Sequence, residues 1–219
     1  MKWLNKLERR FGRSGIQRLM LYISGLMLVV YLIDLFMPEL AFSSYLYLDM
    51  HLVAQGQFWR LFTFAILPPS SSPLFVVISL YFYCMIGDAL EAQWGSFRFN
   101  IFYLCGMLGT ILAGCITGTG VNQYLNLSLF FAFAMLYPDF ELLLFFFLPV
   151  KVKYLAFLDA LYFLYALVMG SWATKAAIVI SVLNILLFFG PDAMQRIKNH
   201  LAYRDSRKTF RQYQNKNRW

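Results

Sequence analysis

The stretch that decides the fold runs from residue 56 to residue 99. It opens with Gly-Gln-Phe-Trp-Arg-Leu-Phe-Thr at 56–63, passes through an apolar run, and closes with Gly-Asp-Ala-Leu-Glu-Ala-Gln-Trp-Gly-Ser-Phe-Arg-Phe at 87–99. A helix needs about 20 mostly apolar residues to cross the hydrocarbon core of a bilayer. The stretch therefore predicts one membrane crossing, with an aromatic loop carrying a Trp-Arg pair on one side and a polar turn on the other.

The composition of the whole chain indicates a membrane-embedded domain. Of the 219 residues, 60% are hydrophobic and 14% are charged, and the mean hydropathy is +0.59. A soluble domain of this size is about half apolar. The cysteines Cys84, Cys105 and Cys115 all lie in apolar stretches, where they read as packing residues. We therefore expect no metal, no cofactor and no disulfide framework.

The net charge of +8 is concentrated at the two ends of the chain. Residues 1–18 hold six Lys or Arg against Glu8 alone, and residues 190–219 hold eight against two Asp. Basic ends of membrane proteins stay in the cytoplasm and touch anionic lipid headgroups, so we expect lipid and not nucleic acid as their partner. The predicted organisation is a basic amphipathic segment at 1–18, a membrane domain at 19–189 and a basic cytoplasmic tail at 190–219.

The apolar runs of the membrane domain predict six crossings. They are 19–37, 74–90, 99–118, 124–137, 154–169 and 171–189. The fourth is too short to cross a full bilayer alone at 1.5 Å per residue, so we expect other helices to surround it. The aromatic loop 38–72 is expected in the outer interface, and 140–150 as a re-entrant or interfacial segment. Six crossings place both termini on one side, and the basic residues assign that side to the cytoplasm.

Small residues predict where the helices pack closely. The third crossing carries Gly106, Thr110, Gly114 and Gly118 at intervals of four, which places them on one helix face. Such a stripe lets a neighbouring backbone approach. The sixth crossing carries a second small-residue stripe that includes Ala177, and we expect it to be the partner of the first.

The order W-R-x-F-T, apolar helix, G-x-x-L-E-x-x-x-G-x-x-R-F resembles the rhomboid superfamily of intramembrane serine proteases and their inactive relatives. Its fixed residues here are Trp59, Arg60, Gly87, Glu91, Gly95 and Arg98. The resemblance extends over roughly residues 19–189 and implies an all-α, polytopic, six-helix rhomboid-like bundle. It also implies that the Trp59-Arg60 loop shapes and thins the surrounding bilayer. Glu91 and Arg98 are expected to hold the loop between the second and third helices.

The catalytic groups that the resemblance implies are missing from this sequence. Active rhomboids carry a serine nucleophile in a G-x-S-G motif of the fourth helix, a histidine base in the sixth, and a His and an Asn from the second that stabilise the oxyanion. The two histidines here, His51 and His200, lie in the first outer loop and the basic tail. The nucleophile position reads Gln123, and the oxyanion positions read Phe75 and Ser79.

Three other arrangements remain open at the level of the sequence. Ser128 and Lys175 could form a Ser–Lys dyad. The simpler interpretation is that the Ser128 hydroxyl bonds to the backbone of its own helix and that the Lys175 side chain extends to the outer interface. His51 could act as a base from its loop. The simpler interpretation is that His51 is a histidine at the membrane interface. Asp34 and Asp159 lie within crossings, where ionisable residues are functional candidates, although each is near enough to a helix end to reach water.

The resemblance implies a rhomboid pseudoprotease that binds transmembrane segments of client proteins and directs their stability, trafficking or dislocation without cutting them. The alternative is an active rhomboid protease with displaced catalytic residues. A transporter or channel is a third class, disfavoured because no paired acids are seen along a path. The expected partners are membrane lipid and client transmembrane segments. The expected location is a bacterial inner membrane, with the endoplasmic reticulum as the alternative.

The charge asymmetry predicts a topology that labelling can test. Single cysteines placed at Asn5 and Phe210 in a cysteine-free background should react only from the cytoplasmic side, and one at Ser70 only from the opposite side. The measurement is labelling with a membrane-impermeant maleimide in intact and opened cells. Labelling of the two terminal positions from opposite sides would contradict the six-crossing topology.

Overall fold

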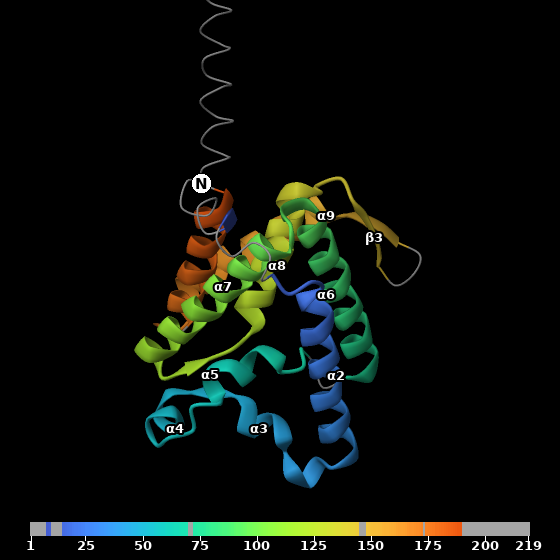
Figure 1. The fold of residues 1–219 in the computed structure, drawn as a ribbon. Coiled ribbons are helices and arrows are strands. Elements are labelled where there is room, and N and C mark those ends of the chain that lie inside the picture. Colours follow the sequence, from blue (N-terminus) through green and yellow to red (C-terminus); the bar gives the residue numbers. More distant parts are fainter. Residues whose placement is uncertain (1–7, 10–14, 70–71, 145–147, 173, 190–219) are drawn as a thin grey trace, which may run out of the picture. The chain divides into compact units, whose positions relative to one another are not determined.

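The computed structural model describes residues 8–9, 15–69, 72–144, 148–172 and 174–189, and it is mostly helical (Figure 1). Twelve of the eighteen residues of the predicted amphipathic segment 1–18, namely 1–7 and 10–14, and the whole of the tail 190–219 lie outside the described residues. The chain divides into two compact units, 1–184 and 185–219. The description below concerns the first unit, apart from the last turns of the final helix.

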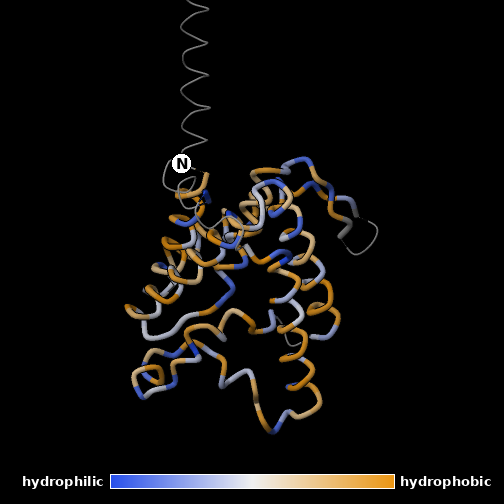
Figure 2. Tube along the Cα trace, in the orientation of Figure 1, coloured by the Kyte–Doolittle hydropathy of each residue, from blue (hydrophilic) through white to orange (hydrophobic). Residues whose placement is uncertain are grey.

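Four of the described helices are long and apolar enough to cross a membrane. They are α2 (Leu19–Phe36), α6 (Pro73–Trp94), α7 (Ser96–Thr117) and α9 (Val152–Met169). Hydrophobic residues predominate along them in Figure 2. The fourth and sixth predicted crossings form the shorter apolar helices α8 (Gln123–Leu136) and Thr174–Phe189. At 1.5 Å per residue, the 14 residues of α8 extend about 21 Å, short of a 30 Å hydrocarbon core.

Local sequence explains where the long helices begin and end. Pro73 opens α6, where its fixed φ and missing N–H are tolerated. Gly95 separates α6 from α7 with a φ of 85°, and Gly118 follows α7 with a φ of 89°. Both values lie in the region that favours glycine. Gly118 therefore ends a helix, and a Cβ placed there would meet nothing within 4 Å. Its predicted role in helix packing is wrong.

The described part of the outer loop, 38–69 and 72, is folded into short helices and turns. They are η2 (Pro38–Leu40), α3 (Phe42–Leu46), α4 (Met50–Ala54), α5 (Arg60–Thr63) and η3 (Phe64–Ile66). Between α3 and α4, strand β1 (Leu48–Asp49) pairs antiparallel with β2 (Thr119–Gly120), which follows α7. This pairing was not predicted. It attaches the loop to the connection between α7 and α8.

Residues 141–144 and 148–151 form the two strands of a β-hairpin. Strands β3 (Glu141–Leu144) and β4 (Leu148–Lys151) pair antiparallel, so the expected re-entrant or interfacial segment has extended backbone. The all-α prediction needs correcting for this hairpin and for the β1–β2 pair. The Lys153 ammonium donates a 2.7 Å hydrogen bond to Asp139 at the base of the hairpin. This bond, together with the nearby positive charge, lowers the pKa of the Asp139 carboxyl below its usual value.

The small residues of α7 face three different neighbours. A Cβ added at Gly106 would meet Leu125 of α8 and Asn184 of the last helix, whereas one at Gly114 would meet Leu48 and Met50 of the outer loop. Ala177 does lie near Gly106, because both line a small void between these helices. The expected single stripe is therefore divided. At Gly106 it packs against helices, and at Gly114 it packs against the outer loop.

Helices α2 and α6 pack side by side (Figure 1). Gly87 of α6 is buried against Met20 of α2, so closely that a Cβ at position 87 would overlap the Met20 Cβ and Cγ. The overlap involves the base of the Met20 side chain, which cannot swing away without moving the α2 backbone. The two helices therefore depend on glycine at this position.

We expect Gly87→Ala to lower the free energy of unfolding by about 1–3 kcal/mol, because the added methyl forces α2 and α6 apart. The measurement is unfolding of the purified protein in detergent. The matched control is Gly25→Ala in α2, where a Cβ meets nothing within 4 Å and alanine improves helix propensity by up to about 1 kcal/mol. Equal stability of the two variants would contradict close packing at Gly87.

Candidate functional site

A polar cavity of about 700 Å³ lies between the outer loop and helices α2, α6 and α8; we call it the loop cavity. Its lining residues are Tyr31, Asp34, Leu35, Ser43, Tyr47, Leu67, Pro68, Pro69, Ser79, Tyr83, Val121, Asn122, Gln123 and Asn126. The buried Asn122 side chain donates to the Leu67 carbonyl at 2.9 Å and holds the start of α8 against the loop. The Asp34 carboxylate accepts the Ser43 backbone N–H at 3.2 and 3.3 Å.

A second cavity of about 340 Å³ lies between α6, α8, α9 and the first strand of the hairpin; we call it the α6–α9 cleft. Its lining residues are Ser79, Phe82, Tyr83, Ile86, Gln123, Asn126, Leu127, Phe130, Leu142, Leu155, Asp159 and Tyr162. Six of these are Leu, Ile or Phe, and the other six carry polar groups. An apolar wall with a few polar groups is the usual make-up of a binding pocket.

The two cavities adjoin through four shared polar residues, Ser79 and Tyr83 of α6 and Gln123 and Asn126 of α8. Residues three or four apart in a helix share a face, so each pair presents two polar groups toward the other helix. Asn126 is 4% exposed, and its Oδ1 has no hydrogen-bond partner among the described residues. A buried acceptor without a donor is costly, and Asn126 Oδ1 is one of five buried side-chain oxygens without a partner among the described residues.

Two of the three predicted degenerate catalytic positions meet at this junction. Gln123 and Ser79 line both cavities. Phe75 lies one turn before Ser79 on α6, is 55% exposed and lines neither cavity. The structure thus brings the Gln123 and Ser79 positions together and leaves the third outside.

The structure does not bring Ser128 and Lys175 together as a dyad. Ser128 is 1% exposed, and its hydroxyl donates to the carbonyl of Leu125 in its own helix at 2.7 Å. The void that it faces has a volume of only about 10 Å³. The Lys175 ammonium instead lies over the ring of Trp172, 5.6 Å from the ring centroid. These positions match the simpler interpretation of Ser128 as a residue bonded to its own helix backbone.

His51 also lies away from both cavities. It sits on α4, exposed, with its Nε2 3.1 Å from the Gln55 side-chain nitrogen. Among the residues described, neither cavity is lined by a Cys or a His, and no group of three His, Cys, Asp or Glu side chains could hold a metal ion. The described part of the site therefore has hydrogen-bonding groups but no histidine base beside a serine.

Arg60 holds the outer loop together from within. It is 4% exposed and donates to the carbonyls of Ser44 and Tyr47 at 2.9 and 2.8 Å and to Gln57 Oε1 at 2.7 Å. Trp59 beside it is half exposed, and its indole N–H donates to the carbonyl of Tyr45. The pair therefore divides its roles: arginine closes the loop, and tryptophan presents an aromatic face outward.

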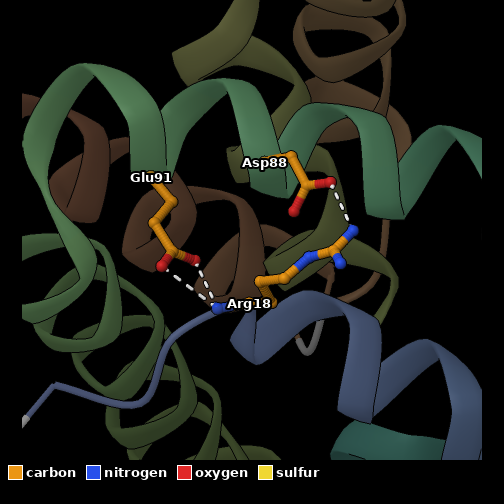
Figure 3. Close-up of polar contacts among 3 residues, drawn as sticks. All are labelled: Arg18, Asp88 and Glu91. Atoms are coloured by element: carbon orange, nitrogen blue, oxygen red, sulfur yellow. Dashed lines mark hydrogen bonds and ion pairs between the residues drawn. The ribbon is translucent and has the colours of Figure 1, made fainter.

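Glu91 joins α6 to the start of α2 (Figure 3). Its carboxylate accepts the Arg18 backbone N–H at 2.8 and 3.0 Å and the Ser96 hydroxyl at 2.5 Å. The Arg18 guanidinium pairs with Asp88 at 3.3 Å, one turn earlier on α6. Glu91 thus spans the turn between α6 and α7, as expected, and also fixes the first residue before α2, which was not expected.

Arg98 binds a residue of the N-terminal segment. Its guanidinium donates to Glu8 at 2.6 and 3.0 Å. Gly15 packs against the backbone of Phe97 at the start of α7, close enough that a Cβ would lie 2.7 Å from the Phe97 nitrogen. The turn between α6 and α7 is therefore the surface on which the described residues of the N-terminal segment dock.

Sequence reasoning missed Tyr83 and Asn126. The available signal was the spacing of polar residues within two apolar helices, Ser79 with Tyr83 and Asn122 with Asn126, each four apart. Asp34 and Asp159 were expected to reach water at helix ends. In the structure, Asp34 lines the loop cavity and Asp159 lines the α6–α9 cleft.

Comparison with known proteins adds no family to this picture. The chain matches no protein-family model, and a search of curated proteins found no match. The resemblance to rhomboids therefore rests on the spaced residues of the 59–99 motif.

We expect Arg60→Lys to loosen the outer loop, because a lysine ammonium cannot bridge the three acceptors that the guanidinium fork reaches. The expected loss is about 1–3 kcal/mol, measured as faster protease cleavage within residues 38–72 of the bilayer-reconstituted protein. The control is Trp59→Phe, which removes one hydrogen bond from a half-exposed side chain and should cost less than about 1 kcal/mol. Equal cleavage of Arg60→Lys and the unmodified protein would refute the role of Arg60.

Proposed function

We propose that this chain is a rhomboid-like integral membrane protein that binds transmembrane segments of client proteins without cleaving them, and thereby influences their stability or trafficking. The observation that carries the proposal is the α6–α9 cleft. It is an apolar-walled opening between two helices that are each long enough to cross a membrane, and it leads to a polar junction shared with the loop cavity.

The walls of the cleft suit a helical, mostly apolar ligand. Its apolar lining comes from three helices: Phe82 and Ile86 of α6, Leu127 and Phe130 of α8, and Leu155 of α9. Inside a bilayer, helices associate through packing and hydrogen bonds, because lipid is as apolar as their side chains. Polar groups at the base of such a cleft give a client segment interactions that lipid does not offer.

The absence of cleavage is proposed from the lining of the two cavities. Hydrolysis by a serine protease needs a nucleophile, a base within hydrogen-bond reach and donors where the oxyanion forms. Gln123 and Ser79, the residues that the rhomboid resemblance aligns with the nucleophile and with one oxyanion position, both line the junction. The closed void around Ser128 and the position of Lys175 over Trp172 disfavour the alternative of a protease with displaced residues.

The proposed location is a bacterial inner membrane with both termini in the cytoplasm, and the endoplasmic reticulum is the alternative. The distribution of charge supports this orientation. Arg18 and Arg98 lie where α2 and α7 begin, and Lys151 and Lys153 lie where α9 begins, all at one end of these helices. At the other end, Arg60 is buried and hydrogen-bonded. Cationic residues retained in the cytoplasm fit this arrangement.

We predict that the purified protein neither cleaves a transmembrane substrate nor is labelled at Ser128 by a fluorophosphonate probe, because this hydroxyl is buried and bonded to its own helix. The measurement is in-gel fluorescence, with an active serine hydrolase added to the same sample as the positive control. Crosslinking to a client transmembrane segment should persist in Ser128→Ala. Labelling or cleavage that Ser128→Ala abolishes would overturn the pseudoprotease reading.

A further inference from the structure

We infer that the α6–α9 cleft selects client segments that carry a basic side chain, Lys or Arg, within their membrane-spanning part. This inference rests on the proposed function and names the class of segment that the same site takes. Two side chains that line the cleft carry it: the carboxylate of Asp159 and the buried, unpartnered carboxamide oxygen of Asn126.

Asp159 is an ionisable residue within α9, partly buried, and its carboxylate has no partner within the described residues. It is the eighth residue of α9, which runs from Val152 to Met169, so it lies about 10 Å along the helix from its start. Within the described residues, no hydrogen bond or ion pair satisfies its carboxylate. A carboxylate at that depth is costly unless it meets a cation or water, and such residues usually face a functional cavity.

Several acceptors line the cleft together with Asp159. The Asn126 Oδ1 has no hydrogen-bond partner among the described residues, and the hydroxyls of Tyr83, which interacts with the Asn126 side chain, and Tyr162 can accept as well as donate. No Lys, Arg or His is among the described residues that line the cleft. Lysine offers three N–H donors and arginine five, and neither has an acceptor. A basic side chain therefore complements the cleft better than an acidic or an apolar one.

The shape of the cleft agrees with this choice. Its volume of about 340 Å³ lies within the range of about 300–1,000 Å³ that ligand pockets usually have. The aliphatic stem of Lys or Arg can lie against Phe82 and Leu155 while its charged end reaches Asp159. A basic residue is expensive in lipid, so a segment that carries one gains more from entering the cleft than an apolar segment does.

The test uses the full-length protein in phosphatidylcholine nanodiscs and synthetic Leu/Ala transmembrane peptides with Lys, Leu or Glu at the centre. Fluorescence energy transfer measures capture. We expect the Lys peptide to bind about tenfold more tightly than the Leu peptide. Asp159→Asn should abolish this difference while leaving capture of the Leu peptide intact, and Asp159→Lys should transfer the preference to the Glu peptide. The matched control is Glu39→Gln, which removes an exposed carboxylate that lines neither cavity and should keep the Lys preference.

The other outcomes separate this inference from the proposed function. Equal capture of the Lys and Leu peptides would overturn the inference and leave the proposed function standing, whereas capture of neither would overturn both. A Lys preference that survives Asp159→Asn, or that Glu39→Gln also removes, would overturn the assignment to the cleft. Cation flux into liposomes that Asp159→Asn abolishes, without a Lys preference, would assign the carboxylate to an ion path and likewise overturn the inference.

Discussion

The close approach of α2 to α6 is the constraint on which the rest of the fold depends. Gly87 allows the two helices to meet at Met20, and Glu91 then accepts the backbone N–H of Arg18, one residue before α2 begins. One turn of α6 therefore fixes both the separation of the two helices and the residue where α2 starts. Because Glu91 also binds Ser96, the start of α7 is set by the same carboxylate.

Because these contacts hold α6 in place, α9 is the less constrained of the two helices that border the α6–α9 cleft. Helix α6 is attached to α2 and α7 by packing and by the Glu91 bonds. Helix α9 is largely exposed along its length, with Val152, Phe163 and Ala166 as its buried residues. The polar groups at the base of the cleft come from α6 and α8, whereas Asp159 comes from α9. A change in the position of α9 would therefore alter the spacing between the carboxylate and the carboxamide of Asn126.

Much of the fold follows from local sequence, because hydropathy and helix-ending residues act over short distances. The apolar runs predicted α2, α6, α7 and α9, and the polar spacing around Glu91 predicted a tie across the α6–α7 turn. The β-hairpin and the β1–β2 pair were missed, since both depend on pairing that hydropathy does not report. Gly118 was misassigned because it continues the four-residue spacing of the packing stripe. In the structure it follows the last residue of α7, with a φ of 89°. The cleft was missed because its lining comes from three helices far apart in sequence.

The pairing of Leu48 with Gly120 links two points 72 residues apart, and this separation imposes an order on biogenesis. At a synthesis rate of about 5–20 residues per second, the outer loop waits roughly 4–14 seconds for its strand partner to emerge. During that interval its compactness depends on contacts already available, chiefly those of Arg60 with Ser44, Tyr47 and Gln57. These hydrogen bonds join residues at most 16 positions apart, so they can form before residue 120 has been synthesised.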